Sequence, residues 1–190
     1  MILLSFKDNK DIWGGNIMGL PSIWHPENYI QAWSQANVSR YFFNSVIVVG
    51  FTIIFVVLFS TMAAYALTRM KWHGRKLVLT IFIMGMMIPI HAALLPDMLI
   101  LKGLRLLDTY MALILPFTAF TLCSSIYILS GFYQSIPQEM EEAGCIDGAS
   151  IFQIFIHIIV PMIRPAISTI AVFAFIWNWN EVMFGNVYIN

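Results

Sequence analysis

Four long stretches of the sequence are almost entirely apolar, and shorter polar segments separate them. They cover residues 41–67, about 77–96, about 110–132 and about 162–180. Arg164 and Pro165 break the last stretch near its start. Roughly 20 apolar residues in a helix cross about 30 Å of hydrocarbon, where the backbone polar groups find no partner outside their own helix. The pattern predicts an all-α integral membrane protein, a polytopic helical bundle with four complete spans.

Composition supports a multi-pass protein in contact with membrane lipid. Hydrophobic residues make up 59% of the chain and charged residues 11%, against about 25% charged residues in a typical soluble domain. The formal net charge is zero, which gives no indication of a nucleic-acid partner. Cys123 lies in an apolar run and Cys145 in an acidic segment, so a disulfide framework is not expected. No metal-ligand spacing surrounds His25 or His91, and we expect neither a metal nor a cofactor.

The basic residues of the short loops predict the orientation. Arg69, Lys71, Arg75 and Lys76 cluster between the first two spans, with no acid among them. The next loop is balanced, because Asp97 and Asp108 offset Lys102 and Arg105. The Arg69–Lys76 loop is therefore expected to be cytoplasmic. Counting across the spans, the 137–161 loop is cytoplasmic too, and both ends of the chain lie outside.

The segment before the last span combines clustered charge with an amphipathic pattern. Four acids stand within nine residues: Glu139, Glu141, Glu142 and Asp147. Pro137 fits the first turn of a helix, and Ser135 and Gln138 have capping-box spacing. The acids that follow suit the positive end of the helix dipole. A short helix is therefore predicted after Ser135.

A second short helix is predicted after Gly148, which allows a turn. Ser150 and Gln153 repeat the capping-box spacing, and Pro161 is expected to end the helix. The loop 135–161 is thus predicted to hold two short helices with a sharp bend, lying outside the hydrocarbon.

This loop resembles the cytoplasmic loop shared by membrane subunits of binding-protein-dependent ABC importers. The family pattern is Glu-Ala-Ala, three residues, Gly, nine residues, then Ile-any-Leu-Pro. Here Glu142-Ala143-Gly144 is followed by Gly148 and, nine residues later, by Ile158-Ile159-Val160-Pro161. Gly144 replaces the second Ala of the pattern and Val160 replaces Leu. The glycine is expected to weaken the helix by about 1 kcal/mol relative to Ala.

The resemblance implies a permease subunit that hydrolyses nothing itself. Its implied partners are ATP-binding ABC subunits, a second permease subunit, an extracytoplasmic solute-binding protein and the solute. In the family, the loop docks on the ATP-hydrolysing subunit and transmits its movement to the spans. The residues expected to make up this ATPase-coupling loop are Glu141, Glu142, Ala143, Gly144, Asp147, Gly148 and Pro161. A contact of the basic cluster with the ATPase is a minor alternative to its role in topology.

Weaker stretches resemble carbohydrate importers of the maltose type. They are Ala63–Arg69 with His73-Gly74-Arg75, the segment from Pro96 to Thr109, and Phe175–Glu181. Family members usually have six spans, and Leu3–Lys7 looks like the tail of the first. We therefore expect residues 1–40 to be an external segment with a remnant of a span. Residues 41–190 are then a transmembrane domain incomplete at its C-terminus, in a chain truncated at both ends.

Polar and aromatic residues near the outer side of the spans are candidates for a translocation path. They are Trp177, Asn178, Asn180 and His91. Aromatic rings stack on sugar faces and amides bond hydroxyls, although Trp at the end of a span is also a common interfacial anchor. His91 lies beside Met86, Met87 and Pro89, where flexible packing around a proline kink is the simpler interpretation.

Other functions remain as alternatives. An ABC importer permease for another small solute, such as an amino acid or a peptide, is compatible with the loop pattern. An intramembrane enzyme would need paired ionisable or nucleophilic groups at depth, but the acids fall in loops or at span edges. A membrane scaffold would not require the spacing from Glu142 to Pro161. The chain is therefore predicted to be a sugar or oligosaccharide permease subunit of the cell membrane.

Overall fold

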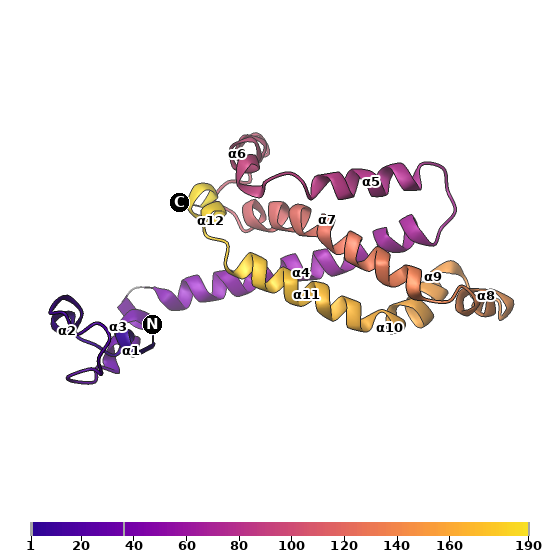
Figure 1. Ribbon diagram of the computed structural model, residues 1–190. Helices are drawn as coiled ribbons and strands as arrows, with labels where there is room; N and C mark the ends of the chain where they lie inside the picture. The colour runs from indigo at the N-terminus through magenta and orange to yellow at the C-terminus, as the bar shows by residue number, and fades with distance from the viewer. Residues whose placement is uncertain (1, 36, 190) are drawn as a thin grey trace. The chain divides into compact units, whose positions relative to one another are not determined.

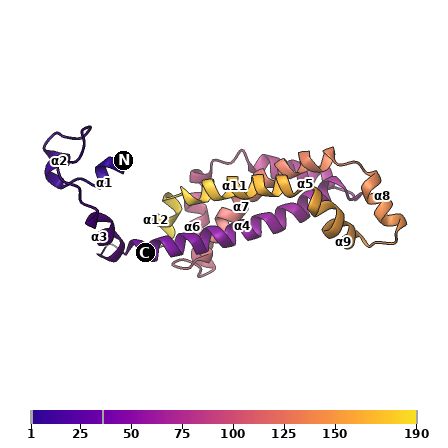
Figure 2. The same ribbon diagram turned by 90° about the horizontal axis from the view of Figure 1, so that it is seen from below.

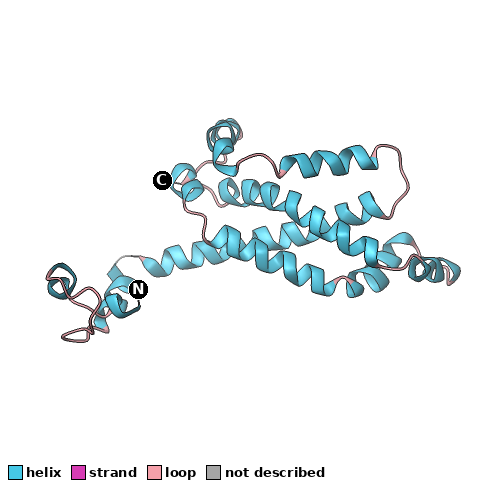
Figure 3. Ribbon diagram, viewed as in Figure 1, coloured by secondary structure: helices cyan, strands magenta, loops and turns pink. Residues whose placement is uncertain are grey.

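The computed structural model describes residues 2–35 and 37–189, and this part of the chain contains helices and loops with no strand (Figure 3). The chain divides into two compact units, Met1–Val46 and Ile47–Asn190.

The described part of the first unit contains short helices joined by loops. The helices are α1 (Ile2–Ser5), α2 (Asn9–Trp13) and α3 (Glu27–Gln35). The buried Lys7 ammonium donates hydrogen bonds to the carbonyls of Asn16 and Ile17. The backbone N–H and the hydroxyl of Ser22 donate to the Asp11 carboxylate at 2.8 and 2.7 Å. Both bonds stabilise the charged form and lower the pKa of Asp11 below its usual value.

The second unit is a helical bundle entered by α4, which begins in the first unit (Figure 1). Its helices are α4 (Val38–Thr68), α5 (Arg75–Gly85), η1 (Ile90–Ala93), α6 (Leu94–Gly103), α7 (Met111–Ser135), α8 (Glu139–Ile146), α9 (Ile151–Ile154), the π-helix η2 (Phe155–Ile159), α10 (Val160–Met162), α11 (Arg164–Trp179) and α12 (Met183–Tyr188). Among the described residues, α4 and α7 are each long and apolar enough to cross a membrane. They confirm the helices predicted at 41–67 and 110–132.

The other two predicted spans are bent pairs of helices. The span predicted over about 77–96 is broken near the kink expected at Pro89: α5 ends at Gly85 and the chain turns by 93° into η1 and α6. The cause lies at Pro89, which is extended with φ −66° and ψ 119° and disfavours helical geometry at the residue before it. The break predicted near Arg164 and Pro165 is confirmed as a 73° bend between α10 and α11. If each bent pair counts as one span, the described residues contain up to four spans. This is the number predicted from the sequence.

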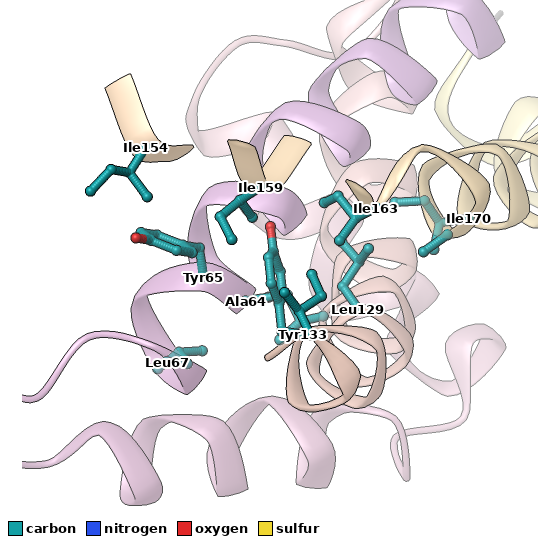
Figure 4. Close-up of a cluster of buried hydrophobic side chains, with 12 residues drawn as sticks. Ala64, Tyr65, Leu67, Leu129, Tyr133, Ile154, Ile159, Ile163 and Ile170 are labelled. Carbon is teal, nitrogen blue, oxygen red and sulfur yellow. The ribbon is translucent and has the colours of Figure 1, made fainter. Parts of the chain in front are cut away.

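Two buried clusters hold the bundle together. The larger one joins the end of α4, the second half of α7 and the segment from α9 to α11 (Figure 4). Within it the Tyr133 hydroxyl donates to the Thr61 carbonyl at 3.0 Å. The second cluster lies around Phe184 of α12 and joins α4, α6, α7 and α12. The loop between α7 and α11 is thus packed against the bundle through the first cluster.

Candidate functional site

The predicted pair of short helices is present, and a glycine makes the bend between them. Gly148 has φ +76°, a left-handed conformation that favours glycine. Its N–H donates to the Cys145 carbonyl at 3.1 Å, and the Ala149 N–H donates to the Gly144 carbonyl at 2.9 Å. These two bonds form a Schellman motif, which satisfies the last carbonyls of α8. The turn is therefore defined by the backbone at Gly148.

The second of the two predicted capping boxes is confirmed. The Ser150 hydroxyl oxygen accepts from the Gln153 N–H at 3.3 Å, and the Ser150 N–H donates to Gln153 Oε1 at 2.8 Å. The first predicted box is wrong. Because α7 extends through Ser135, that hydroxyl donates to the Phe132 carbonyl of its own helix at 2.8 Å. The N-cap of α8 is Gln138, which makes no side-chain cap bond.

We expect Ser150→Ala to destabilise the start of α9 by about 1 kcal/mol, because it removes the acceptor of the capping box. The measurement is hydrogen exchange of the 151–154 amides in the purified complex. Ser168→Ala is the matched control, since that hydroxyl only donates to the Arg164 carbonyl within a helix. Equal exchange at α9 in both variants would show that the cap does not hold this helix.

Pro161 does not end the second helix, contrary to the prediction. The helix widens to a π-helix over Phe155–Ile159 and continues as α10 through Pro161 to Met162. Proline lacks an N–H, and its ring clashes with the carbonyl four residues earlier, here that of His157. The wider π turn at His157 changes the spacing of the carbonyls and lets the helix continue past the proline.

The predicted coupling residues divide between two faces of α8. Glu142, Ala143, Asp147 and Gly148 are exposed. The neighbouring Ile146 is 86% exposed, although nothing in the sequence pattern distinguished it from a buried isoleucine. Ile146 therefore lies on the exposed side of the loop together with Glu142 and Asp147.

Gly144 faces the opposite way, into the loop. It is buried, and a Cβ at this position would lie 2.8 Å from Ile158 Cδ1 and 3.1 Å from Ile154 Cγ1. Close packing between α8 and the α9–η2 segment therefore occupies the space of the methyl group that the family pattern places here. Glycine replaces the alanine of the family pattern here because a methyl group would not fit. The sequence alone predicted only that this glycine weakens the helix.

Glu141 also faces inward, where it meets Arg69 at the end of α4. Arg69 Nε lies 3.3 Å from Glu141 Oε1, and the Tyr65 hydroxyl donates to Glu141 Oε2 at 3.2 Å. The Arg69 guanidinium also donates to the carbonyls of Tyr133 and Ile136. Sequence reasoning assigned Arg69 to a basic loop cluster and missed this contact. The only available signal was its position directly after an apolar span.

The candidate path residues lie at the other end of the bundle. A cavity of about 610 Å³ is present where α5, η1, α7 and α11 meet, and both His91 and Trp177 line it. Asn178 is instead buried, and its amide donates to the Ala174 carbonyl at 2.7 Å and to Thr121 Oγ1 at 3.4 Å. Asn180 is exposed and donates to the Ile176 carbonyl at 2.6 Å. The four residues are therefore not gathered in one place.

His91 contacts a carboxylate that follows the end of α11. Its Nε2 lies 3.3 Å from Glu181 Oε2, while Glu181 Oε1 accepts from the N–H groups of Met183 and Phe184 at the start of α12. The contact connects the broken span to the last helix beside the cavity. Among the described residues, no group of three His, Cys, Asp or Glu side chains is placed to hold a metal.

These features define a class: a polytopic helical membrane protein in which a bent pair of short helices packs on the bundle. Residues 56–190 match the family described as the binding-protein-dependent transport system inner membrane component. The chain belongs to this family and is a multi-pass protein of the cell membrane.

Particular relatives support this placement. The chain is 37% identical over 190 residues to the probable ABC transporter permease protein YurM of Bacillus subtilis, covering 100% of this chain and 63% of the relative. It is 37% identical over 183 residues to the diacetylchitobiose uptake system permease protein NgcG of Streptomyces coelicolor, covering 96% and 60%. The chain thus spans about three fifths of the length of these relatives.

A solved structure shows the same fold. It is a chain of a bacterial ABC transporter involved in the import of the acidic polysaccharide alginate, with a TM-score of 0.88 and 23% identity. The match covers 100% of this chain and 66% of that chain.

Proposed function

We propose that this chain acts as a permease subunit of an ABC importer for a sugar or oligosaccharide. It forms part of the translocation path, and a separate ATP-binding subunit hydrolyses ATP. A second permease subunit and an extracytoplasmic solute-binding protein complete the complex. The observation that carries the proposal is the outward face of the α8–α9 loop, where the family pattern, the exposed charges and the exposed Ile146 coincide.

The shape of this face suits a docking partner. A short exposed helix with a protruding apolar side chain can insert into a groove of another protein. Ile151 and Phe152 on α9 are 58% and 66% exposed and extend the apolar surface beyond the Gly148 turn. Glu142 and Asp147 place carboxylates beside it. We assign this surface to the ATP-binding subunit.

The position of the loop supports a cytoplasmic location. The loop between α4 and α5, which carries Arg69 and Lys71, lies at the same end of the bundle as α8 and α9 (Figures 1 and 2). Short loops rich in Lys and Arg are cytoplasmic as a rule. The α8–α9 loop then lies on the side where ATP is available.

We place the cavity beside the α5 break on the translocation path. Its wall combines the rings of Trp177 and Phe173 with the hydroxyls of Thr121 and Ser125 and the imidazole of His91. Aromatic faces suit the apolar faces of a sugar, and hydroxyls suit its polar edge. The name of the Streptomyces relative refers to diacetylchitobiose, which supports a carbohydrate rather than an amino acid.

Trp177→Ala is expected to lower the efficiency of solute uptake about tenfold, because it removes the largest ring from the cavity wall, whereas Trp177→Phe keeps a ring and loses less. The measurement is uptake of labelled oligosaccharide by proteoliposomes. Trp179→Ala is the control, since Trp179 lies on the same helix end but not on the cavity wall. Equal losses in both alanine variants would indicate interfacial anchoring instead.

The function is tested by purifying the whole complex and identifying its subunits. We expect an ATP-binding subunit and a second permease to co-purify, and ATP hydrolysis to rise when the binding protein carries a sugar. Stimulation by amino acids or peptides alone would contradict the carbohydrate assignment. A complex without any ATP-binding subunit would contradict the importer assignment.

A further inference from the structure

We infer that Arg69 and Tyr65 on α4 form a latch with Glu141 on α8, through which movement of the loop is transmitted to the first long span. The latch is defined as these three residues. The inference rests on the proposed function, because it assumes that a partner moves α8.

The latch joins four segments at one guanidinium. Arg69 follows directly after α4 and makes an ion pair with Glu141 in the first turn of α8. The same guanidinium donates to the carbonyls of Tyr133, near the end of α7, and of Ile136, between α7 and α8. The end of α4, the end of α7, the linker and α8 are therefore held at a single side chain.

Burial makes the connection firm. The Arg69 side chain is only 6% exposed and that of Glu141 is 19% exposed. A buried charge that loses its partner is left uncompensated, which is energetically costly. The cost of separating Arg69 from Glu141 therefore holds the two side chains together. The Tyr65 hydroxyl bonds the second carboxylate oxygen of Glu141, which fixes its orientation.

The latch gives α8 a direct connection to a span. The helix packs mainly on α9 and η2, which belong to the same loop. Its outer face carries Glu142, Ala143 and Ile146, while Glu141 on its inner face contacts α4. A displacement of α8 by a partner then moves the end of α4 as well as the chain leading to α11. Since α4 is one continuous helix, a shift at Arg69 is passed along the part of the span that lies in the bundle.

The latch is thus a positioning device rather than part of the docking surface. A residue that only stabilised the loop would, when replaced, release the ATP-binding subunit or the whole chain. A residue that transmits movement would, when replaced, leave the complex assembled and ATP hydrolysis active but reduce transport per ATP.

The test is the number of ATP molecules hydrolysed per solute taken up, measured with the complete complex in proteoliposomes. Glu141→Gln removes the charge but keeps an oxygen that can accept from Tyr65, and it is expected to raise this ratio at least fivefold with normal subunit content. Tyr65→Phe is expected to raise it about twofold. The matched control, Glu139→Gln, changes an exposed acid in the same turn of α8 and is expected to keep the wild-type ratio.

Two results would overturn the latch. One is a wild-type ratio in Glu141→Gln. The other is parallel loss of ATP hydrolysis, uptake and ATP-binding subunit in that variant, which indicates a purely structural role. Failure of the latch can be told apart from failure of the proposed function. If the proposed function is wrong, the wild-type complex itself shows no ATP hydrolysis coupled to uptake.

Discussion

Replacing Gly148 with proline is expected to leave the complex in the membrane but to reduce solute uptake at least tenfold. Gly148 has φ +76°, whereas the proline ring fixes φ near −65°. Proline also removes the N–H that donates to the Cys145 carbonyl, one of the two bonds of the turn. The backbone between α8 and α9 must rearrange, and the two helices can no longer present one surface. The measurement compares uptake with ATP hydrolysis in the purified complex.

Gly148→Asn is the matched control for this prediction. Asparagine adopts left-handed geometry more readily than other side chains and keeps the N–H, so it should retain most of the uptake. Uptake equal to the wild type in Gly148→Pro would show that the shape of the turn is not needed for coupling.

Ile146→Asp is expected to weaken binding of the ATP-binding subunit about 30-fold or more. Ile146 is 86% exposed at the end of α8, and an apolar anchor buried at the centre of an interface contributes about 2 kcal/mol or more. An aspartate in the same pocket would also have to lose its hydration. The measurement is the affinity of the purified ATP-binding subunit for the permease in nanodiscs.

Leu104→Asp provides the comparison for Ile146. Leu104 is 60% exposed and follows α6, at the opposite end of the bundle from α8 (Figure 1). It should leave this affinity unchanged. Equal affinities for the wild type and Ile146→Asp would exclude this part of α8 from the interface.

The straight spans could be predicted from the sequence because apolar run length alone defines them. The runs that became α4 and α7 were located to within a few residues. The size of the 93° bend after α5 was not predicted, since hydropathy is equally high on both sides of a bend. Pro89 indicated a kink, but whether a proline bends or ends a helix depends on the packing of the neighbouring helices.

The loop was predictable where its residues interact with near neighbours in sequence. The Gly148 turn and the Ser150–Gln153 capping box depend on residues within a few positions of each other. The contact between Arg69 and Glu141 was not predictable, because it joins groups 72 positions apart. The exposure of Ile146 likewise depends on which face of α8 the bundle covers.

The central claim is that the outer face of α8 lies in the cytoplasm and is covered by an ATP-binding subunit. Cys145 is an exposed thiol on α8 and serves as a native reporter once Cys123 is replaced by serine. We expect a membrane-impermeant maleimide to label Cys145 in inside-out vesicles only, and bound ATP-binding subunit to protect it. Labelling from the outside of right-side-out vesicles, or labelling unaffected by that subunit, would contradict the claim.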